Sequence, residues 1–204
     1  DMGGGITSIA AFKDNEFIYG DMIPFGGHHV TRDIAQGLST PMAAAERLKT
    51  LFGNCLSGVS TVRNRIDVTQ IGDSGQESVT TIPRRMLTSI IEPRVEEIFE
   101  LVRDKIIEAG LENTVGRRLI ITGGASQLGG VEELAKKTFK CGVRLGRPLN
   151  VDGLADTTAG AGFSTGAGLL LYATLKPEEL HFMKQTKPKQ GVFEGISSWF
   201  KENF

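Results

Sequence analysis

The sequence predicts a mixed α/β fold, and three patterns indicate this class. Two short β-branched segments separated by a turn, residues 6–12 and 17–19, are expected to open the chain as strands. Residues 83–110 repeat apolar side chains at helical spacing and are expected to form the longest helix. Residues 117–122 form a short apolar run followed at once by glycines, which is typical of a strand in a buried parallel sheet.

The composition is that of an ordinary globular protein. The 204 residues are 40% hydrophobic and 23% charged, which excludes intrinsic disorder. Twenty-three Lys and Arg against 24 Asp and Glu give a net charge of −1, so bulk charge predicts no nucleic-acid binding. Cys55 and Cys141 are too few for a disulfide framework and are expected as core thiols. Glycine makes up 26 of the 204 residues, or 12.7%, whereas ~7% is usual. This excess indicates loops where the backbone closely approaches a ligand.

The other elements follow from apolar spacing and helix-end signals. Thr40 is expected as an N-cap, with Pro41 at the first position of a helix that stops at Gly53. Pro93 predicts a kink or a break in the long helix, which ends at Gly110. In chain order, the further expected elements are a helix at 30–38, strands at 65–71 and 78–82, a helix at 131–138, a strand at 143–145 and a glycine-rich stretch leading into an apolar helix over 159–175.

The first residues, DMGGG, form a glycine turn. A turn of this kind normally joins two strands, so we expect the chain to be the C-terminal part of a longer protein. Three consecutive glycines let backbone N–H groups point at an anion. The adjacent Asp1 carboxylate can hold Mg²⁺ through water, because Mg²⁺ keeps several of its waters. A plain turn between strands is the alternative.

Two other segments carry residues suited to the base and the ribose of a nucleotide. Residues 123–126, GGAS, lie between the expected buried strand and a helix, where bare glycine lets a base or ribose lie on the backbone. A structural strand–helix turn is the alternative there. Glu46 and Lys49 share one helix face at i, i+3. They could bond to ribose hydroxyls, or form a solvated surface pair.

Taken together, these motifs resemble the actin-like, ribonuclease H-like ATPase superfamily. More narrowly, the chain is similar to the C-terminal half of the FtsA family of bacterial cell-division proteins. The likeness covers essentially the whole chain and is carried by the segments DMGGGITSIAAF, HHVTRDIAQGLSTPMAAAERLKTLFG, IPRRMLTSIIEPRVEEIFELV, LIITGGASQLGGVEELA and GVFEGISSWFKENF. The alternatives are an ATP-hydrolysing enzyme or chaperone of the superfamily, Hsp70-like or sugar-kinase-like, and an MreB-like filament.

The resemblance implies an organisation around one actin-like lobe. Residues 1–38 and 117–175 would form the second large lobe, and residues 39–116 a smaller α+β subdomain inserted in it. Residues 176–190, rich in Lys, Gln and Pro, would be a flexible linker, and residues 191–204 an amphipathic membrane-targeting helix. In this superfamily ATP sits between two lobes, so this chain alone is expected to bind nucleotide poorly.

The resemblance also implies ATP and Mg²⁺ as cofactors. Asp1 would lie near the Mg²⁺, through water. The glycine turn would lie under the phosphates, the Glu–Lys pair would face the ribose, and the GGAS segment would meet the adenosine; the implied residues are Gly3, Gly4, Gly5, Glu46, Lys49, Gly123, Gly124 and Ser126. Ile6 and Ser8 stand where many relatives carry Thr and Asp. We therefore expect at most a weak ATPase with no assigned catalytic residue, in which nucleotide mainly supports polymerisation.

The partners that the resemblance implies are those of a cell-division adaptor. It would bind the FtsZ C-terminal peptide on the inserted subdomain, polymerise into filaments, recruit other divisome proteins, and lie on the cytoplasmic face of the cell membrane at the division site. Arg84, Arg85 and Arg94 are the candidate peptide contacts. A solvated helix face or a filament contact is the alternative for these three arginines.

The last fourteen residues carry an apolar helical stripe that consists of Val192, Phe193, Ile196, Trp199, Phe200 and Phe204. At a rise of ~1.5 Å per residue they span about 21 Å, too short to cross a ~30 Å hydrocarbon core. A helix lying in the membrane interface fits this length. The alternative is that the tail docks back onto the globular domain. His28 and His29 lack partners at metal-ligand spacing, so no zinc site is expected.

Overall fold

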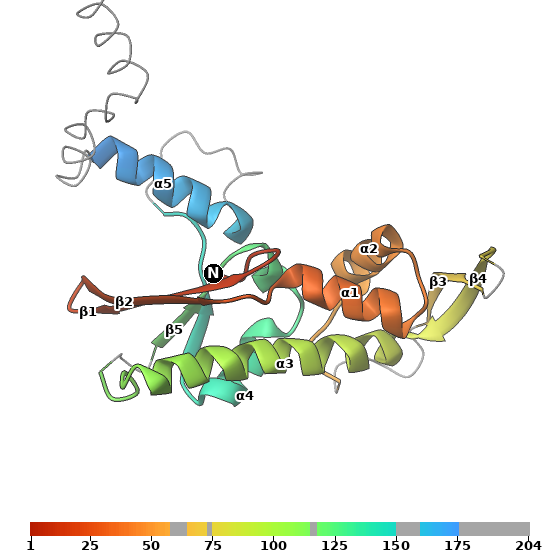
Figure 1. The fold of residues 1–204 in the computed structure, drawn as a ribbon, viewed down its shortest axis with the longest axis horizontal. Helices are drawn as coiled ribbons and strands as arrows, with labels where there is room; N and C mark the ends of the chain where they lie inside the picture. The colour runs from red at the N-terminus through yellow and green to blue at the C-terminus, as the bar shows by residue number, and fades with distance from the viewer. Residues whose placement is uncertain (58–64, 73–74, 115–117, 150–159, 176–204) are drawn as a thin grey trace, which may run out of the picture. The chain divides into compact units, whose positions relative to one another are not determined.

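The computed structural model describes residues 1–57, 65–72, 75–114, 118–149 and 160–175 (Figure 1). It confirms the mixed α/β class expected from the sequence. The chain divides into two compact units, Asp1–Thr165 and Gly166–Phe204. Within the described ranges, helices are too short or too polar to cross a membrane. The expected linker and amphipathic tail, residues 176–204, lie outside the described residues.

The chain begins with the expected hairpin. Strand β1, Thr7–Lys13, pairs antiparallel with β2, Glu16–Ile23, in the register Lys13↔Glu16. The two residues between them, Asp14 and Asn15, have φ values of 52° and 67°. A two-residue turn that matches the twist of its strands needs positive φ at both positions, and Asp and Asn adopt it at low cost. The hairpin is therefore specified locally. β1 has the expected seven residues, shifted by one position, and β2 is longer than the three residues that the sequence pattern predicts.

Two helices follow the hairpin. Helix α1, Gly27–Gly37, buries Val30 and Ile34, as the expected apolar face requires. Helix α2 runs over Met42–Phe52 and is followed by Gly53. The predicted N-cap role of Thr40 is wrong, because the cap position is Pro41 and makes no side-chain bond. The Thr40 hydroxyl instead donates to the carbonyl of Thr69, so a tertiary contact has replaced the local one.

The long helix α3, Arg84–Glu108, follows an antiparallel pair of strands, β3 at Arg65–Ile71 and β4 at Glu77–Pro83. Pro93 does not break α3. Its ring lies on the exposed side, and Ser89, whose carbonyl loses its usual donor, is also exposed, so water can replace that bond. Gly110 ends the helix as predicted, with a φ of 69° and an N–H bond to the Ile107 carbonyl.

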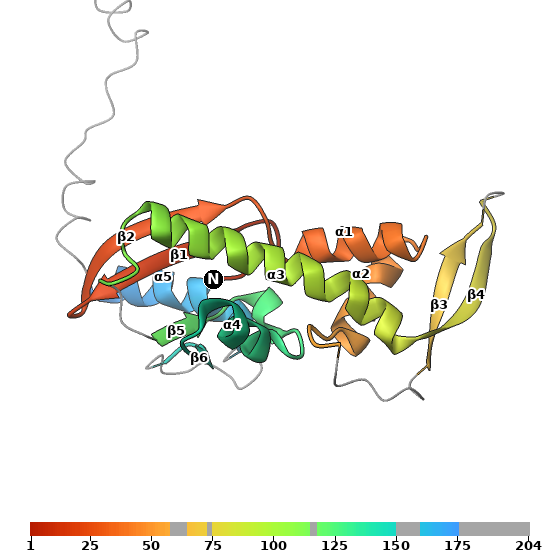
Figure 2. The ribbon, with the colours of Figure 1, turned by 90° about the horizontal axis from the view of Figure 1, so that it is seen from below.

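Helix α3 is the scaffold of the first unit. It packs against α1, β2 and α4, and the two hairpins lie at its opposite ends (Figures 1 and 2). Its buried face supplies a large share of the hydrophobic core, with Leu87, Ile91, Val95, Ile98, Phe99 and Val102. The sequence spacing therefore identified the face of α3 that is buried.

The last sheet holds a parallel pair, as predicted. Strand β5, Arg118–Ile121, pairs with β6, Gly142–Leu145, and the connection carries the short 3₁₀ helix η1, Gly124–Gln127, and helix α4, Val131–Phe139. Ile121 is buried, but Ile120 is 51% exposed. The expectation of full burial for this strand is therefore wrong, since among the described residues the Ile120 face is left open.

The described chain ends with a second 3₁₀ helix and an apolar helix. The 3₁₀ helix η3 spans Ala161–Phe163, and α5 spans Ser164–Leu175. This matches the expected glycine-rich stretch that leads into a helix. Most of α5 belongs to the second unit, which begins at Gly166, and its Leu169 and Leu170 are exposed.

Candidate functional site

The glycine turn is a closed four-residue loop. The Gly3 N–H donates to the Ile6 carbonyl over 2.9 Å, which turns the chain back into β1. Within the described ranges, the N–H groups of Gly4 and Gly5 have no acceptor, and both residues are exposed. Two adjacent free amides on a glycine turn are the donors that an anion needs.

The carbonyl side of this turn faces helix α1. Gly27 N–H donates to the Gly3 carbonyl over 2.9 Å, and His28 N–H donates to the Gly4 carbonyl over 2.8 Å. The first amides of α1 are therefore already satisfied, and an anion here would meet the amides of the turn instead. The approach is so close that a Cβ on Gly26 would lie 2.6 Å from the Gly3 oxygen, which explains why glycine stands at that position.

Asp1 ties the turn to the second glycine motif. Its Oδ2 accepts a hydrogen bond from the Thr165 hydroxyl. Its Oδ1 lies against Gly123, where an added Cβ would be only 2.3 Å away. Met2 N–H donates to the Thr122 carbonyl over 2.7 Å. Residues 1–2 therefore lie directly beside the end of β5.

The GGAS segment is a tightly held turn. Gly123 has a φ of 91°, which favours glycine, and its N–H donates to the Ala161 carbonyl over 3.1 Å. Ser126 is 1% exposed, and its hydroxyl donates to the Gly123 carbonyl over 2.7 Å. That hydroxyl is thus used inside the turn. A Cβ on Gly124 would meet nothing within 4 Å, so this backbone is open to a ligand.

Glu46 and Lys49 form an anchored network. Lys49 Nζ donates to the Gly27 carbonyl at 3.0 Å, to the Thr31 hydroxyl at 2.8 Å and to Glu46 Oε2 at 2.7 Å. The Lys49 side chain is only 11% exposed. Burial raises the pKa of Glu46, but hydrogen bonds from Lys49 and Thr31 outweigh it and leave that pKa below its usual value. The Lys49 end of the pair is therefore fixed to α1 and not freely solvated.

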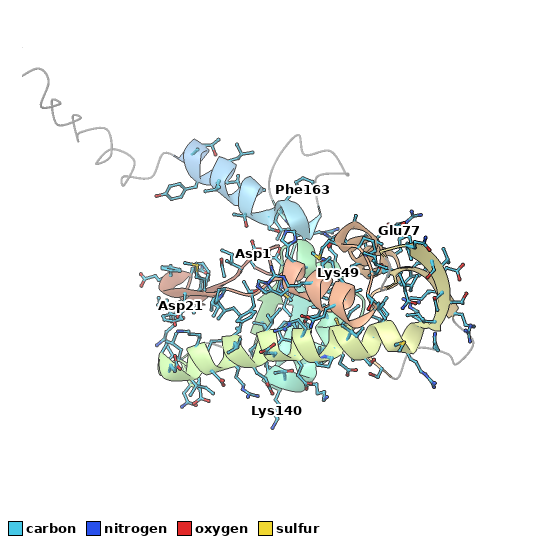
Figure 3. The ribbon with its side chains drawn as sticks, turned by 45° about the vertical axis from the view of Figure 1, so that its right-hand side comes forward. Asp1, Asp21, Lys49, Glu77, Lys140 and Phe163 are labelled. Atoms are coloured by element: carbon cyan, nitrogen blue, oxygen red, sulfur yellow. The ribbon has the colours of Figure 1, made fainter. Side chains whose placement is uncertain are left out.

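All three expected motifs meet around Gly27. A Cβ there would lie 3.2 Å from the Ala125 methyl, 3.5 Å from Lys49 Nζ and 3.6 Å from the Gly3 oxygen. Figure 3 labels Asp1, which precedes the glycine turn, and Lys49, which belongs to the α2 pair. The structure thus brings the glycine turn, the α2 pair and the GGAS segment into one place.

Two residues of the site were not expected from the sequence. Gly27 supplies the carbonyl that Lys49 binds, and Thr31 bonds to the Glu46 carboxylate. The signal that could have found Thr31 is its spacing: it lies four residues after Gly27 and therefore on the same helix face. Only the tertiary contact of α1 with α2 gives that face its role.

The three candidate arginines lie outside this site and have different roles. Arg94 donates to Asp33 through Nε at 2.5 Å and Nη2 at 3.2 Å, and its guanidinium lies 5.7 Å from the Phe25 ring. Arg84 Nε donates to the Phe52 carbonyl over 2.8 Å. Arg85 is exposed and has no hydrogen bond or ion pair with the described residues. Of the three, Arg85 is the one left available to a partner.

The acidic residues near the glycine turn fit a Mg²⁺ ion that is held mainly by nucleotide phosphates and water. The described ranges contain no cluster of three or more His, Cys, Asp or Glu that could form a protein cage for a metal ion. Mg²⁺ needs no such cage, because one or two carboxylates and nucleotide phosphates hold it together with water. The Asp1 carboxylate lies within two residues of the glycine turn and fits that role.

Comparisons with known proteins agree with this architecture. The family model of cell division protein FtsA matches residues 1–168. The chain is 40% identical to cell division protein FtsA of Rhizobium meliloti (strain 1021) over 208 residues, 100% of this chain and 47% of that protein. The chain thus spans about half the length of the curated relatives it matches.

The fold is similar to solved structures of actin-like proteins. MreB 5 of Spiroplasma citri bound to AMPPNP superimposes with a TM-score of 0.62 at 15% identity, over 88% of this chain and 53% of that chain. The PilM–PilN type IV pilus biogenesis complex gives 0.63 at 18% identity, over 87% of this chain and 45% of that chain. These likenesses show an actin-like fold. With the family match over residues 1–168, they lead to one conclusion: the chain belongs to the FtsA family of cell-division proteins.

Proposed function

We propose that this chain supplies one face of an ATP site in an actin-like cell-division protein. The convergence of three motifs around Gly27 is the observation that supports this most strongly. The free amides of Gly4 and Gly5 would meet the phosphates, as Gly3 closes the turn beneath them. The Glu46–Lys49 pair would face the ribose. The open backbone at Gly124 would meet the base.

Asp1 would hold Mg²⁺ through a water molecule. When bound, Mg²⁺ would neutralise part of the phosphate charge. Since Ile6 lacks the hydroxyl and Ser8 lacks the carboxylate that many relatives have at these positions, we infer that hydrolysis is weak at most. ATP would then act chiefly by supporting filament formation.

The division of labour along the chain would follow the FtsA pattern. Residues 1–38 and 117–175 would form the nucleotide-binding lobe, and residues 39–116 would form the subdomain that carries the FtsZ peptide site. Residues 176–190 would link this body to an amphipathic helix at 191–204. Arg85, exposed at the start of α3, is the strongest of the three arginines as a contact for the acidic part of a partner.

The tail would tether the protein to the cytoplasmic face of the membrane. Fully burying one large apolar side chain gives about 1.5–3 kcal/mol, so six half-buried ones give roughly 5–9 kcal/mol before the cost of folding the helix. One tail would then bind reversibly, and several tails on one filament would bind through avidity. Polymerisation would control attachment to the membrane, with FtsZ and other divisome proteins held there.

The single tryptophan gives the test of the tether. Trp199 emission is recorded as anionic and then neutral vesicles are added to the wild-type protein and to Phe200→Glu. A blue shift with anionic vesicles that Phe200→Glu abolishes supports the proposal. A spectrum that is already blue without lipid means that the tail docks on protein, and an unshifted red spectrum at every vesicle concentration means that it does not bind. Either result contradicts the tether.

A further inference from the structure

The His28 side chain lies on the glycine turn, and neither the hydrogen bonds among the described residues nor the proposed ATP contacts use it. It is the second residue of α1, and its ring packs over Gly4: a Cβ on Gly4 would lie 2.7 Å from His28 Nε2 and 2.9 Å from Cδ2. The side chain itself is exposed. A glycine at position 4 therefore leaves room for this ring directly beside the two free amides of the turn.

The neighbouring histidine shows what a structural role looks like here. His29 Nδ1 accepts a hydrogen bond from the Gly26 N–H over 3.2 Å, and its ring packs on Phe25 with centroids 5.0 Å apart. In the described part of the chain, the ring nitrogens of His28 have no hydrogen-bond partner. The fold therefore fixes His29 and leaves the donor of His28 free.

The charged groups around His28 do not supply a hydrogen-bond partner for its ring. The Glu46 carboxylate, on α2, attracts a positive charge on His28, but it is already bonded to Lys49 and Thr31. Lys49 is in turn held by Gly27. Asp1, which precedes the turn, accepts a hydrogen bond from Thr165. On α1 itself, the exposed Arg32 lies one helical turn after His28. An anion on the turn would be the remaining acceptor within reach.

We propose that His28 is a nucleotide-binding residue that donates through Nε2 to an oxygen of the phosphate chain seated on the glycine turn. This inference rests on the proposed ATP site and adds to it a side-chain contact with pH dependence. An imidazole gains a positive charge within the range of pH 5 to 8. Affinity for a polyphosphate should therefore rise as pH falls, because the protonated ring adds an ion pair to the hydrogen bond.

The test compares nucleotide binding at two pH values in the intact protein. Calorimetry with Mg²⁺ and ATP, ADP or adenosine is run at pH 5.8 and 8.2 on wild type, His28→Gln and Arg32→Gln. The ratio of wild-type to His28→Gln affinity for ATP should be about two- to fivefold larger at pH 5.8, the size of an exposed ion pair. Adenosine should bind equally to both. Arg32→Gln removes a nearby charge and should leave the pH dependence at its wild-type value.

The outcomes separate this inference from the site on which it rests. If His28→Gln binds ATP with the wild-type pH dependence, His28 does not contact phosphate, while the ATP site stands. If no variant binds ATP at either pH, the proposed ATP site itself fails. The His28 ring resonance in wild-type protein is the second measurement, and it needs no variant. ATP should raise the pH at which that resonance titrates, and a titration that ATP leaves unmoved overturns the proposal.

Discussion

Lys49 on α2 donates a hydrogen bond to the carbonyl of Gly27 on the first turn of α1, over 3.0 Å. The two residues are 22 positions apart in the chain, and their contact fixes α2 against the glycine turn. A helix-surface pair of Glu and Lys would ordinarily be worth a few tenths of a kcal/mol. This pair is different, because its lysine is almost buried and serves three acceptors.

Removing the Lys49 ammonium should therefore be costly. Lys49→Met removes the charged donor of the Gly27 carbonyl and the Glu46 carboxylate and leaves only the Thr31 hydroxyl to serve them, so we expect a loss of about 1–3 kcal/mol in the free energy of unfolding. Urea unfolding at pH 7 measures it. Lys136→Met is the matched control, because its bond to Glu132 lies on an exposed face of α4. A loss no larger than in that control would contradict the anchored network.

The same pair predicts how stability depends on pH. The folded-state pKa of Glu46 lies below its ordinary value, so the carboxylate stabilises the fold above an ordinary pKa of about 4.3. That contribution is lost as pH falls through the lower, folded-state pKa. The stability difference between wild type and Glu46→Gln, from urea unfolding, should therefore shrink between pH 7 and pH 3. A difference that stays constant over this range would show that the charge of Glu46 contributes nothing.

The arginines of α3 should separate stability from partner binding. Arg94→Ala removes a two-pronged bond to the half-buried Asp33, so we expect it to cost about 2 kcal/mol of unfolding free energy. Arg85→Ala should change stability by less than about 0.5 kcal/mol, because Arg85 is exposed. Thermal unfolding measures both. Binding of the FtsZ C-terminal peptide should weaken in Arg85→Ala, and an unchanged affinity would remove Arg85 from the proposed contact.

The two cysteines should differ in reactivity. Cys55 is 0% exposed, and burial raises the pKa of its thiol to about 12. Burial also raises the pKa of Cys141, but that residue is partly exposed. A thiol reagent at pH 8 should label Cys141 in the folded protein and Cys55 only on unfolding. The rate of labelling is compared between wild type and Cys141→Ser, in which Cys55 is the remaining thiol. Rapid labelling of Cys55 in the folded state would contradict its burial.

Much of the fold could be predicted because its elements are specified locally. The apolar spacing of α3 and the strand pattern at β3 depend on residues close together in the chain, and both were located correctly. The Thr40 cap was wrong because Thr69, 29 residues away, competes for its hydroxyl. Pro93 does not break α3, because it sits on the exposed side, where water can replace the lost bond.

The candidate site divides in the same way. Its glycines and the Glu46–Lys49 pair stand out in the sequence, since glycine clusters and i, i+3 charges are visible without a structure. Their meeting point at Gly27 does not, because it depends on how α1 packs against α2 and on the turn after β5. The free ring of His28 could be found only once Gly4 was placed beneath it.

The ATP affinity of Gly124→Ala tests the proposed site most directly. The added methyl meets no protein atom within 4 Å, so the variant should be as stable as wild type, while the methyl occupies the space assigned to the base. We predict at least about tenfold weaker ATP binding to the intact protein, the cost of one overpacked methyl. Gly72→Ala, on the loop after β3, should bind ATP as wild type does. Wild-type affinity in a folded Gly124→Ala would contradict a nucleotide at this site.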